Sequence, residues 1–199
     1  MKITSIKQQV KRTDRYSVFV EGKYAFSLSE NALLESKIAS GQELTRQQLG
    51  EFKKLSSDDK LFNQTLRYVA MRPKSRWEIE FYLVRKKQAP PVLAEDILNK
   101  LSNIGMIDDS KLAQTIVNGR RLLRPASRRK MIMELRKKRI SDAIIEQAVG
   151  HESADEQAAL TDVIDKKRRQ TKYQDDQKLM QYLARQGFNY SDIKSALEN

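Results

Sequence analysis

The middle of this chain carries a dense cluster of cationic side chains, and cations at such density could bind a polyanion. Between Asn118 and Ile140 there are ten arginines and lysines but a single acid, Glu134. Repulsion among these charges is unfavourable unless something offsets it. A shorter basic run, Lys166 to Arg169, follows farther along the chain. The candidate contact residues are Arg120, Arg121, Arg124, Arg128, Arg129, Lys130, Arg136, Lys137, Lys138, Arg139, Lys166, Lys167, Arg168 and Arg169.

The whole chain shares this bias, with 38 lysines and arginines against 26 acids in 199 residues and a formal charge of +12. The balance favours nucleic acid or an acidic protein surface as the partner. A structural interpretation competes with this one. Cations in the last turn of a helix complement its dipole, which is worth about 0.3 to 1 kcal/mol each, and charge runs often form a solvated face. We give the functional interpretation more weight at the central cluster than at the run from Lys166 to Arg169.

Residues that could support catalysis or metal binding have simpler explanations. Two S-x-x-K sequences, starting at Ser127 and Ser191, resemble the motif of acyl-serine enzymes, but each serine stands where a predicted helix needs an N-cap and the companion motifs are missing. His151 is the only histidine, which we expect at the surface near a helix end, and cysteine is absent, so no metal-ligand set is present. No glycine-rich phosphate loop occurs. We therefore expect no enzyme, no metal, no cofactor and no small-molecule substrate.

Two further pairs of residues are explained by helix geometry and packing. Asp108 and Asp109 are adjacent, so their carboxylates point in different directions, and we expect them to begin a helix whose dipole favours negative charge there. Trp77 and Tyr190 could stack on nucleic-acid bases. Their positions fit packing against the protein better.

The cellular setting follows from what the sequence lacks. Without cysteine there is no disulfide framework, which suits a reducing cytoplasm. The first ten residues contain no apolar run of the signal-peptide kind, and no stretch approaches the roughly 18 apolar residues of a membrane span. We expect a cytoplasmic protein that does not contact membranes.

The elements that position these residues begin with a small sheet. Apolar residues alternate at period two over residues 16–20 and 24–28, with Glu21-Gly22 between them as a tight turn. This pattern predicts a β-hairpin. A third strand is expected within Ile3 to Val10, because an isolated hairpin is marginal in water.

Helix signals occupy the rest of the chain. Ser29 is a predicted N-cap for a helix over residues 31–40 that ends at Gly41, and Thr45 with Gln48 forms a capping box for the next helix. Beyond it, caps, prolines and glycines predict three groups of three helices. The predicted helices span 58–71, 75–86 and 91–104, then 108–124, 127–140 and 141–150, then a long helix from 153, a helix over 175–186 and a short one from 191.

These groups are related by an internal repeat. Leu83, Leu135 and Leu183 each follow an apolar residue by four positions, and Ile97, Ile145 and Ile193 recur at one fixed interval. A period of this size indicates one small helical unit used three times, each stabilised by its neighbours. The fold class is therefore mainly α: three tandem three-helix repeats form a curved, elongated array, preceded by a small antiparallel sheet and two helices. The predicted segments are 1–56, 57–107, 108–151 and 152–199.

The middle helix of the second repeat has two distinct faces. At 100° per residue, Met131, Leu135 and the stem of Lys138 share the side that faces the repeat's own core. Arg129, Met133 and Arg136 therefore point away from that core.

Several short motifs occur in these repeats. They are Ser75-Arg76 with Glu78 and Leu83, Ile104-Gly105-Met106-Ile107-Asp108-Asp109 with Ala113, Glu134-Leu135, and Tyr182-Leu183 followed by Gly187-Phe188-Asn189-Tyr190 and Ile193. Together these motifs resemble the RecX family. The resemblance covers residues 58–199 well, and the hairpin start is similar to the longer members of Gram-positive bacteria. One departure is Arg139-Ile140, where many members carry Gly-Ile.

The resemblance implies a non-enzymatic regulator, mainly an inhibitor, of the RecA recombinase. Proteins of this family bind in the groove of the RecA filament on single-stranded DNA and modulate ATP hydrolysis, strand exchange and coprotease activity, hence DNA repair, recombination and the SOS response. The implied partners are the RecA filament and single-stranded DNA, bound weakly or through RecA. We expect the chain itself to be a monomer.

Two other classes remain open. A stand-alone DNA-binding protein could use the three-helix units as helix-turn-helix modules, and its duplex affinity would fall about a thousandfold or more between 50 and 200 mM salt. A protein-only scaffold could use the basic surface to match an acidic partner, and added DNA would not change its binding.

Overall fold

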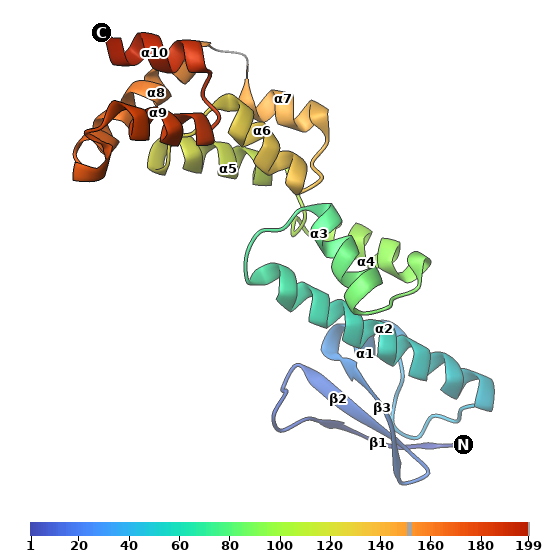
Figure 1. Cartoon of the computed structure of the whole chain (residues 1–199). Coiled ribbons are helices and arrows are strands. Elements are labelled where there is room, and N and C mark those ends of the chain that lie inside the picture. The colour runs from blue at the N-terminus through green and yellow to red at the C-terminus, as the bar shows by residue number, and fades with distance from the viewer. Residues whose placement is uncertain (151–152, 199) are drawn as a thin grey trace. The chain divides into compact units, whose positions relative to one another are not determined.

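The structure is a computed structural model that describes residues 1–150 and 153–198 and contains two compact units (Figure 1). The first unit comprises residues 1–72 and 82–101, and the second comprises residues 73–81 and the chain from 102 onward. His151, whose surface position was predicted, lies outside the described residues. The expected fold class, mainly α with a small N-terminal antiparallel sheet and three-helix repeats, is confirmed.

The sheet forms as the alternation predicts. Strands β1 (Ile3–Gln8), β2 (Arg15–Val20) and β3 (Lys23–Ser29) pair antiparallel in the order β1-β2-β3. Between β2 and β3, Glu21 and Gly22 both have positive φ, 50° and 75°, as a tight hairpin turn requires. One face of the sheet is buried against the following helices, with Val18, Phe26 and Leu28 in its core.

Helices α1 (Glu30–Ser36) and α2 (Arg46–Ala70) follow the sheet. The predicted caps are present: the Ser29 side chain accepts the Ala32 N–H, and Thr45 and Gln48 form a capping box. The predicted end of α1 is wrong, because Lys37 adopts a left-handed conformation and stops the helix early. A separate helix starting at residue 58 is also wrong, since α2 runs through this position without a break.

A buried ion pair fixes α2 against the sheet. Arg15 of β2 donates to the Asp59 carboxylate of α2 at 2.9 Å, and the two side chains are only 3% and 6% exposed. Arg15 also donates to the Ser27 carbonyl at 2.8 Å. Asp59 further accepts the Ser29 N–H at 2.9 Å and an Asn63 amide N–H at 2.8 Å. Asp59 therefore connects two strands to the middle of α2.

The remaining helices begin and end close to the predicted positions. The predicted helix over 75–86 changes geometry halfway, because the Lys87 N–H donates to the Tyr82 carbonyl five residues earlier. The elements are α3 (Arg76–Phe81), the π-helical turn η1 (Tyr82–Lys86), α4 (Pro91–Asn103), α5 (Asp109–Leu123), α6 (Arg128–Lys137), α7 (Asp142–Val149), α8 (Ser153–Arg168), the 3₁₀ turn η2 (Thr171–Tyr173), α9 (Asp176–Arg185) and α10 (Tyr190–Glu198).

The repeat positions are buried as the internal echo predicts. Leu135 and Ile145 lie in the core of α5, α6 and α7, and Leu183 and Ile193 lie in the core of α8, α9 and α10. Ile97 of α4 is buried as well. The second and third three-helix repeats thus use their middle and last helices to fill their own cores.

Across the part of the chain that the structure describes, no helix combines the length and the apolar character needed to cross a membrane.

Candidate interaction surface

Helix α6 is held in a defined orientation at both its start and its buried face. At its start, the Ser127 hydroxyl accepts the Lys130 N–H at 3.1 Å and donates to the Gln186 carbonyl at 2.9 Å. Met131 and Leu135 are buried in the repeat's core. Because the inward face is fixed in this way, the opposite face of α6 has a defined direction, as the 100° spacing predicts.

That opposite face lines an open groove, which we call the outer groove. Its volume is about 470 Å³. Met133 is 52% exposed in it, and arginines lie on both sides of this apolar side chain. The groove is lined by Arg128, Arg129, Ile132, Met133, Arg136, Glu156, Gly187 and Asn189.

Two arginines of the outer groove are available to a partner. Among the described residues, the Arg129 side chain has no ion-pair or hydrogen-bond partner, and it is exposed. Arg136 contacts Asp142 at 3.0 Å, but the two side chains are 62% and 74% exposed. An ion pair this exposed is worth only about 0 to 1 kcal/mol, so a partner's anion can displace it. Arg129 and Arg136 are two helical turns apart on one face of α6.

Other members of the predicted cluster stabilise the second repeat. Arg120 makes a two-point contact with Glu134, at 2.9 and 2.7 Å, which joins α5 to α6. Arg128 donates to the Gly150 carbonyl at 3.0 Å and pairs with Glu146 at 2.8 Å. These contacts neutralise charges that the sequence presents as an uncompensated excess.

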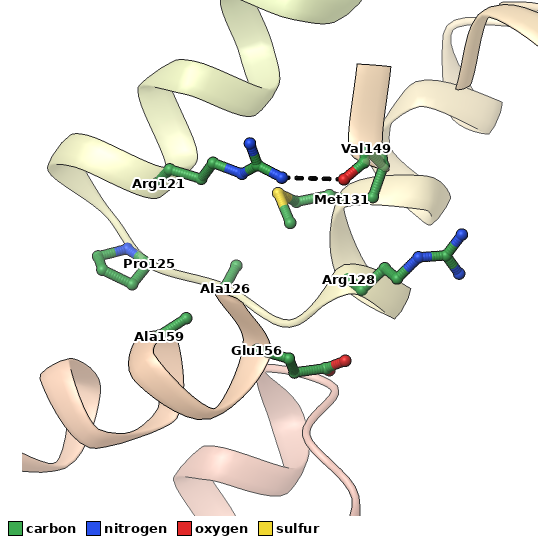
Figure 2. A pocket seen from close by; sticks show the side chains of 8 residues that line it. All are labelled: Arg121, Pro125, Ala126, Arg128, Met131, Val149, Glu156 and Ala159. Atoms are coloured by element: carbon green, nitrogen blue, oxygen red, sulfur yellow. Dashed lines mark hydrogen bonds between the residues drawn. The ribbon is translucent and has the colours of Figure 1, made fainter. Parts of the chain in front are cut away.

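Arg121 closes a small cavity where α5 and α6 meet α8. Figure 2 shows Arg121 donating to the Val149 carbonyl, with Met131 beside this bond and Glu156 and Ala159 of α8 on the other side of the cavity. The bond is 2.9 Å long. The cavity volume is about 30 Å³, enough for a single water molecule and not for an organic ligand.

Lys138 lies at a contact between the first and second repeats. The Ser75 hydroxyl, which accepts the Glu78 N–H, donates to the Lys138 carbonyl at 2.7 Å. The Lys138 ammonium reaches back to Glu78 at 2.9 Å. Arg139 has φ 57°, and its guanidinium lies 5.9 Å from the Trp77 ring centre. The departure from glycine at this position therefore places a left-handed arginine against Trp77.

The same contact recurs between the second and third repeats. Ser127 takes the place of Ser75, and its hydroxyl donates to the Gln186 carbonyl as Ser75 donates to that of Lys138. The Lys130 ammonium donates to the Gln186 side chain. In the first contact the lysine, Lys138, supplies the carbonyl, whereas in the second the lysine, Lys130, lies on the helix that begins at the serine. Lys130 and Lys138 are thus part of how successive repeats join.

The basic run at the end of α8 stabilises the turn that follows it. Lys166 pairs with Asp162 at 2.7 Å, and the Lys167 ammonium lies 4.6 Å from the Tyr182 ring centre. Arg168 donates to the Gln174 carbonyl at 2.8 Å and pairs with Asp176. Arg169 is exposed.

The fourteen predicted contact residues therefore do not form one continuous surface of free charge. Acids within the cluster and beyond it pair with several of these cations. Four residues are exposed and have no side-chain partner among the described residues: Arg124, Arg129, Lys137 and Arg169. The prediction did not include the apolar side chains of the outer groove, although the helical spacing already placed Met133 on that face.

Three other predicted positions can be located. Trp77 is 40% exposed, so it packs only in part, against Phe81 and Arg139. The packing prediction is wrong for Tyr190, which is 66% exposed at the start of α10. Asp109 accepts the Arg76 N–H at 2.9 Å, and burial raises the pKa of its carboxyl above the ordinary value.

Comparisons with known proteins agree with these repeats. Residues 1–45 match the model of the regulatory protein RecX N-terminal domain, residues 108–149 the second three-helix domain of RecX, and residues 154–197 its third three-helix domain. The regulatory protein RecX of Bacillus subtilis strain 168 is 27% identical over 98% of this chain and 76% of its own length. That of Listeria monocytogenes EGD-e is 36% identical over 57% of this chain and 42% of its own length.

Solved structures give the same result. A crystal structure of regulatory protein RecX is similar over 100% of this chain and 99% of its own, with 25% identity and a TM-score of 0.76. The crystal structure of RecX from Lactobacillus salivarius has the same fold over 71% of this chain and 94% of its own, with 23% identity and a TM-score of 0.58. From the three matched domains, the relatives and the full-length structural likeness, we conclude that this chain belongs to the RecX family of regulatory proteins.

Proposed function

We propose that this protein regulates the RecA recombinase by binding the filament that RecA forms on single-stranded DNA. Binding inhibits ATP hydrolysis, strand exchange and coprotease activity, and so affects DNA repair and the SOS response. The protein acts in the cytoplasm as a monomer, without catalysis of its own. Its working segments are the N-terminal region to residue 56 and the repeats over 57–107, 108–151 and 152–199.

The outer groove is the observation that supports this proposal most, and the chain's membership of the RecX family supports RecA as the partner. An apolar floor at Met133 between Arg129 and Arg136 suits a protein surface that carries acids beside an apolar side chain. Phosphates alone would not need the apolar floor. We therefore assign the outer groove to RecA and the other exposed cations, such as Arg124 and Lys137, to steering toward the negatively charged filament.

The test is ATP hydrolysis by a cognate RecA on single-stranded DNA. Substoichiometric amounts of the protein should suppress it, and no suppression would reject the proposal. The variant R129E/R136E should require at least tenfold more protein for half suppression, because truncating or reversing a central interface charge typically costs 2 kcal/mol or more. The control is K111E/K194E, which reverses two exposed lysines outside the outer groove and should suppress as the parent does.

The alternative of a stand-alone DNA-binding protein predicts a different result. Tight binding to duplex DNA without RecA, lost steeply between 50 and 200 mM salt, would support it. In that case R129E/R136E would weaken duplex binding, and the ATPase of RecA would respond only to competition for DNA.

A further inference from the structure

The N-terminal unit contains an open pocket at the edge of its sheet, which we call the sheet pocket. It lies where the edge strand β3 meets one face of α2 and the loop after β1, and its volume is about 410 Å³. None of the described residues that line it is acidic. The lining consists of Gln9, Arg12, Arg15, Tyr24, Ala25, Phe26, Ser27, Lys53, Ser56, Ser57 and Lys60.

The α2 side of the pocket presents cations and hydroxyls at helical spacing. Ser56, Ser57 and Lys60 follow Lys53 by three, four and seven residues, so the four residues share one face of α2. Both lysines are exposed, and neither has a side-chain partner among the described residues. Two free ammonium groups on one face of α2, with the exposed Ser57 between them, form a surface that suits phosphate oxygens.

The opposite side of the pocket adds a third cation and an aromatic ring. Arg12 has one acid nearby, Asp14, at 3.5 Å. Tyr24 is 59% exposed, and its ring packs edge-on against Phe19 with centroids 6.1 Å apart. A ring held in this way and open to solvent can stack a nucleic-acid base, which is sequence-independent because every base has a π face.

The pocket is rigid for reasons that do not involve a ligand. Ser56 Oγ donates to the Ser27 carbonyl at 2.6 Å and accepts the Ser27 N–H at 3.3 Å, so α2 is fastened to the edge strand. The buried pair of Arg15 and Asp59 lies next to this contact and satisfies the charge of Arg15. The cations left for a ligand are therefore Arg12, Lys53 and Lys60.

We propose that the sheet pocket binds single-stranded nucleic acid, with phosphates at Lys53, Lys60 and Arg12 and a base stacked on Tyr24. The volume suits about one nucleotide, in the range of small-ligand pockets. The combination of free cations with an exposed aromatic ring favours a single strand over duplex DNA, whose bases are already stacked. This inference does not depend on the proposed function, because it requires no RecA.

The test is binding of the full chain to fluorescent oligo-dT by anisotropy, without RecA, over a range of salt concentrations. In K53Q/K60Q, loss of two phosphate contacts should reduce the salt slope by about 1.4 and the affinity at 0.15 M salt by about tenfold. The control K54Q/K86Q removes two exposed lysines of the same unit outside the pocket and should change neither quantity. Y24F should bind as the parent does, whereas Y24A should lose about tenfold.

Two further arms distinguish the source of the phosphate. Inorganic phosphate at millimolar concentration should not compete with oligo-dT, and a 20-base-pair duplex should bind less tightly than the single strand. Ultraviolet cross-linking of thiothymidine-containing oligo-dT should label peptides containing Tyr24 or residues 53–60. Any one of three results would overturn the assignment. In the first, K53Q/K60Q binds oligo-dT as tightly as the parent. In the second, millimolar inorganic phosphate displaces oligo-dT, and in the third the duplex binds as tightly as the single strand.

Discussion

Replacing Asp59 by asparagine tests whether the buried ion pair holds the N-terminal unit together. The side chains of Arg15 and Asp59 are almost fully buried, and the asparagine would leave the Arg15 guanidinium charged with no compensating anion. Breaking a buried pair by removing one partner costs about 3 to 5 kcal/mol. That is a large share of the roughly 5 to 15 kcal/mol by which a domain is stable. We expect D59N to lose most of the stability of this unit.

Hydrogen exchange measured by mass spectrometry localises the effect. Amides of β3 and α2 should exchange about a hundredfold faster or more in D59N, since 3 kcal/mol corresponds to more than two decades in the opening equilibrium. Amides of α8 and α9, in the other unit, should be unchanged. The matched control is D162N, which breaks the exposed pair of Asp162 and Lys166 and should cost less than about 0.5 kcal/mol.

A second variant excludes a trivial effect of the amide. In D59L/R15M both charges are replaced by apolar side chains of similar length, and such replacements of buried pairs are often neutral or stabilising. The double variant should therefore recover most of the exchange protection that D59N loses. If D59N exchanges in β3 and α2 within threefold of the parent, the reasoning that α2 depends on this pair is refuted.

Two other predictions concern the second unit. Gly187→Ala should destabilise this unit by about 1 to 3 kcal/mol in thermal unfolding, because Gly187 has φ 90° and a Cβ there would collide with Ser127 Oγ. The control is Gly119→Ala, inside α5 with free space around it. This variant should be neutral or stabilising by up to about 1 kcal/mol. Burial raises the pKa of Asp109, so its contribution to stability is greatest below the unfolded pKa and is lost as the pH rises through the folded value. The permanently neutral D109N should therefore be more stable than the parent at pH 7 in urea unfolding, with the difference shrinking toward pH 4, and a difference that grows as the pH falls would contradict this sign.

Local signals in the sequence predict most of the fold. The hairpin follows from alternation and a turn at Glu21-Gly22, and the helix starts follow from capping serines such as Ser127. The two faces of α6 follow from helical spacing, which places Leu135 inside and Met133 outside. These features depend on residues within a few positions of one another, so a single sequence carries enough information for them.

Features that depend on distant partners were not predictable in the same way. Asp59 lies 44 positions from Arg15, so no local pattern indicates that these two side chains form a buried pair. Lys138 and Glu78 are 60 positions apart, and their contact uses a cation of the basic cluster to join two repeats. This charge is therefore not free for a partner. The π turn at Tyr82–Lys86 changes the helix geometry after Phe81, and no capping signal in the sequence marks this change. The candidate surface is therefore smaller than the cluster that predicted it.

We propose that the outer face of α6 contacts RecA, and photo-cross-linking tests this contact most directly. A photoreactive phenylalanine analogue at Met133, which is 52% exposed in the outer groove, should cross-link to RecA when the protein is mixed with RecA, single-stranded DNA and a non-hydrolysable ATP analogue. The same analogue at Lys111, exposed on α5 and outside the groove, should give little product. Equal cross-linking from both positions, or cross-linking from Lys111 alone, would show that the outer groove is not where RecA binds.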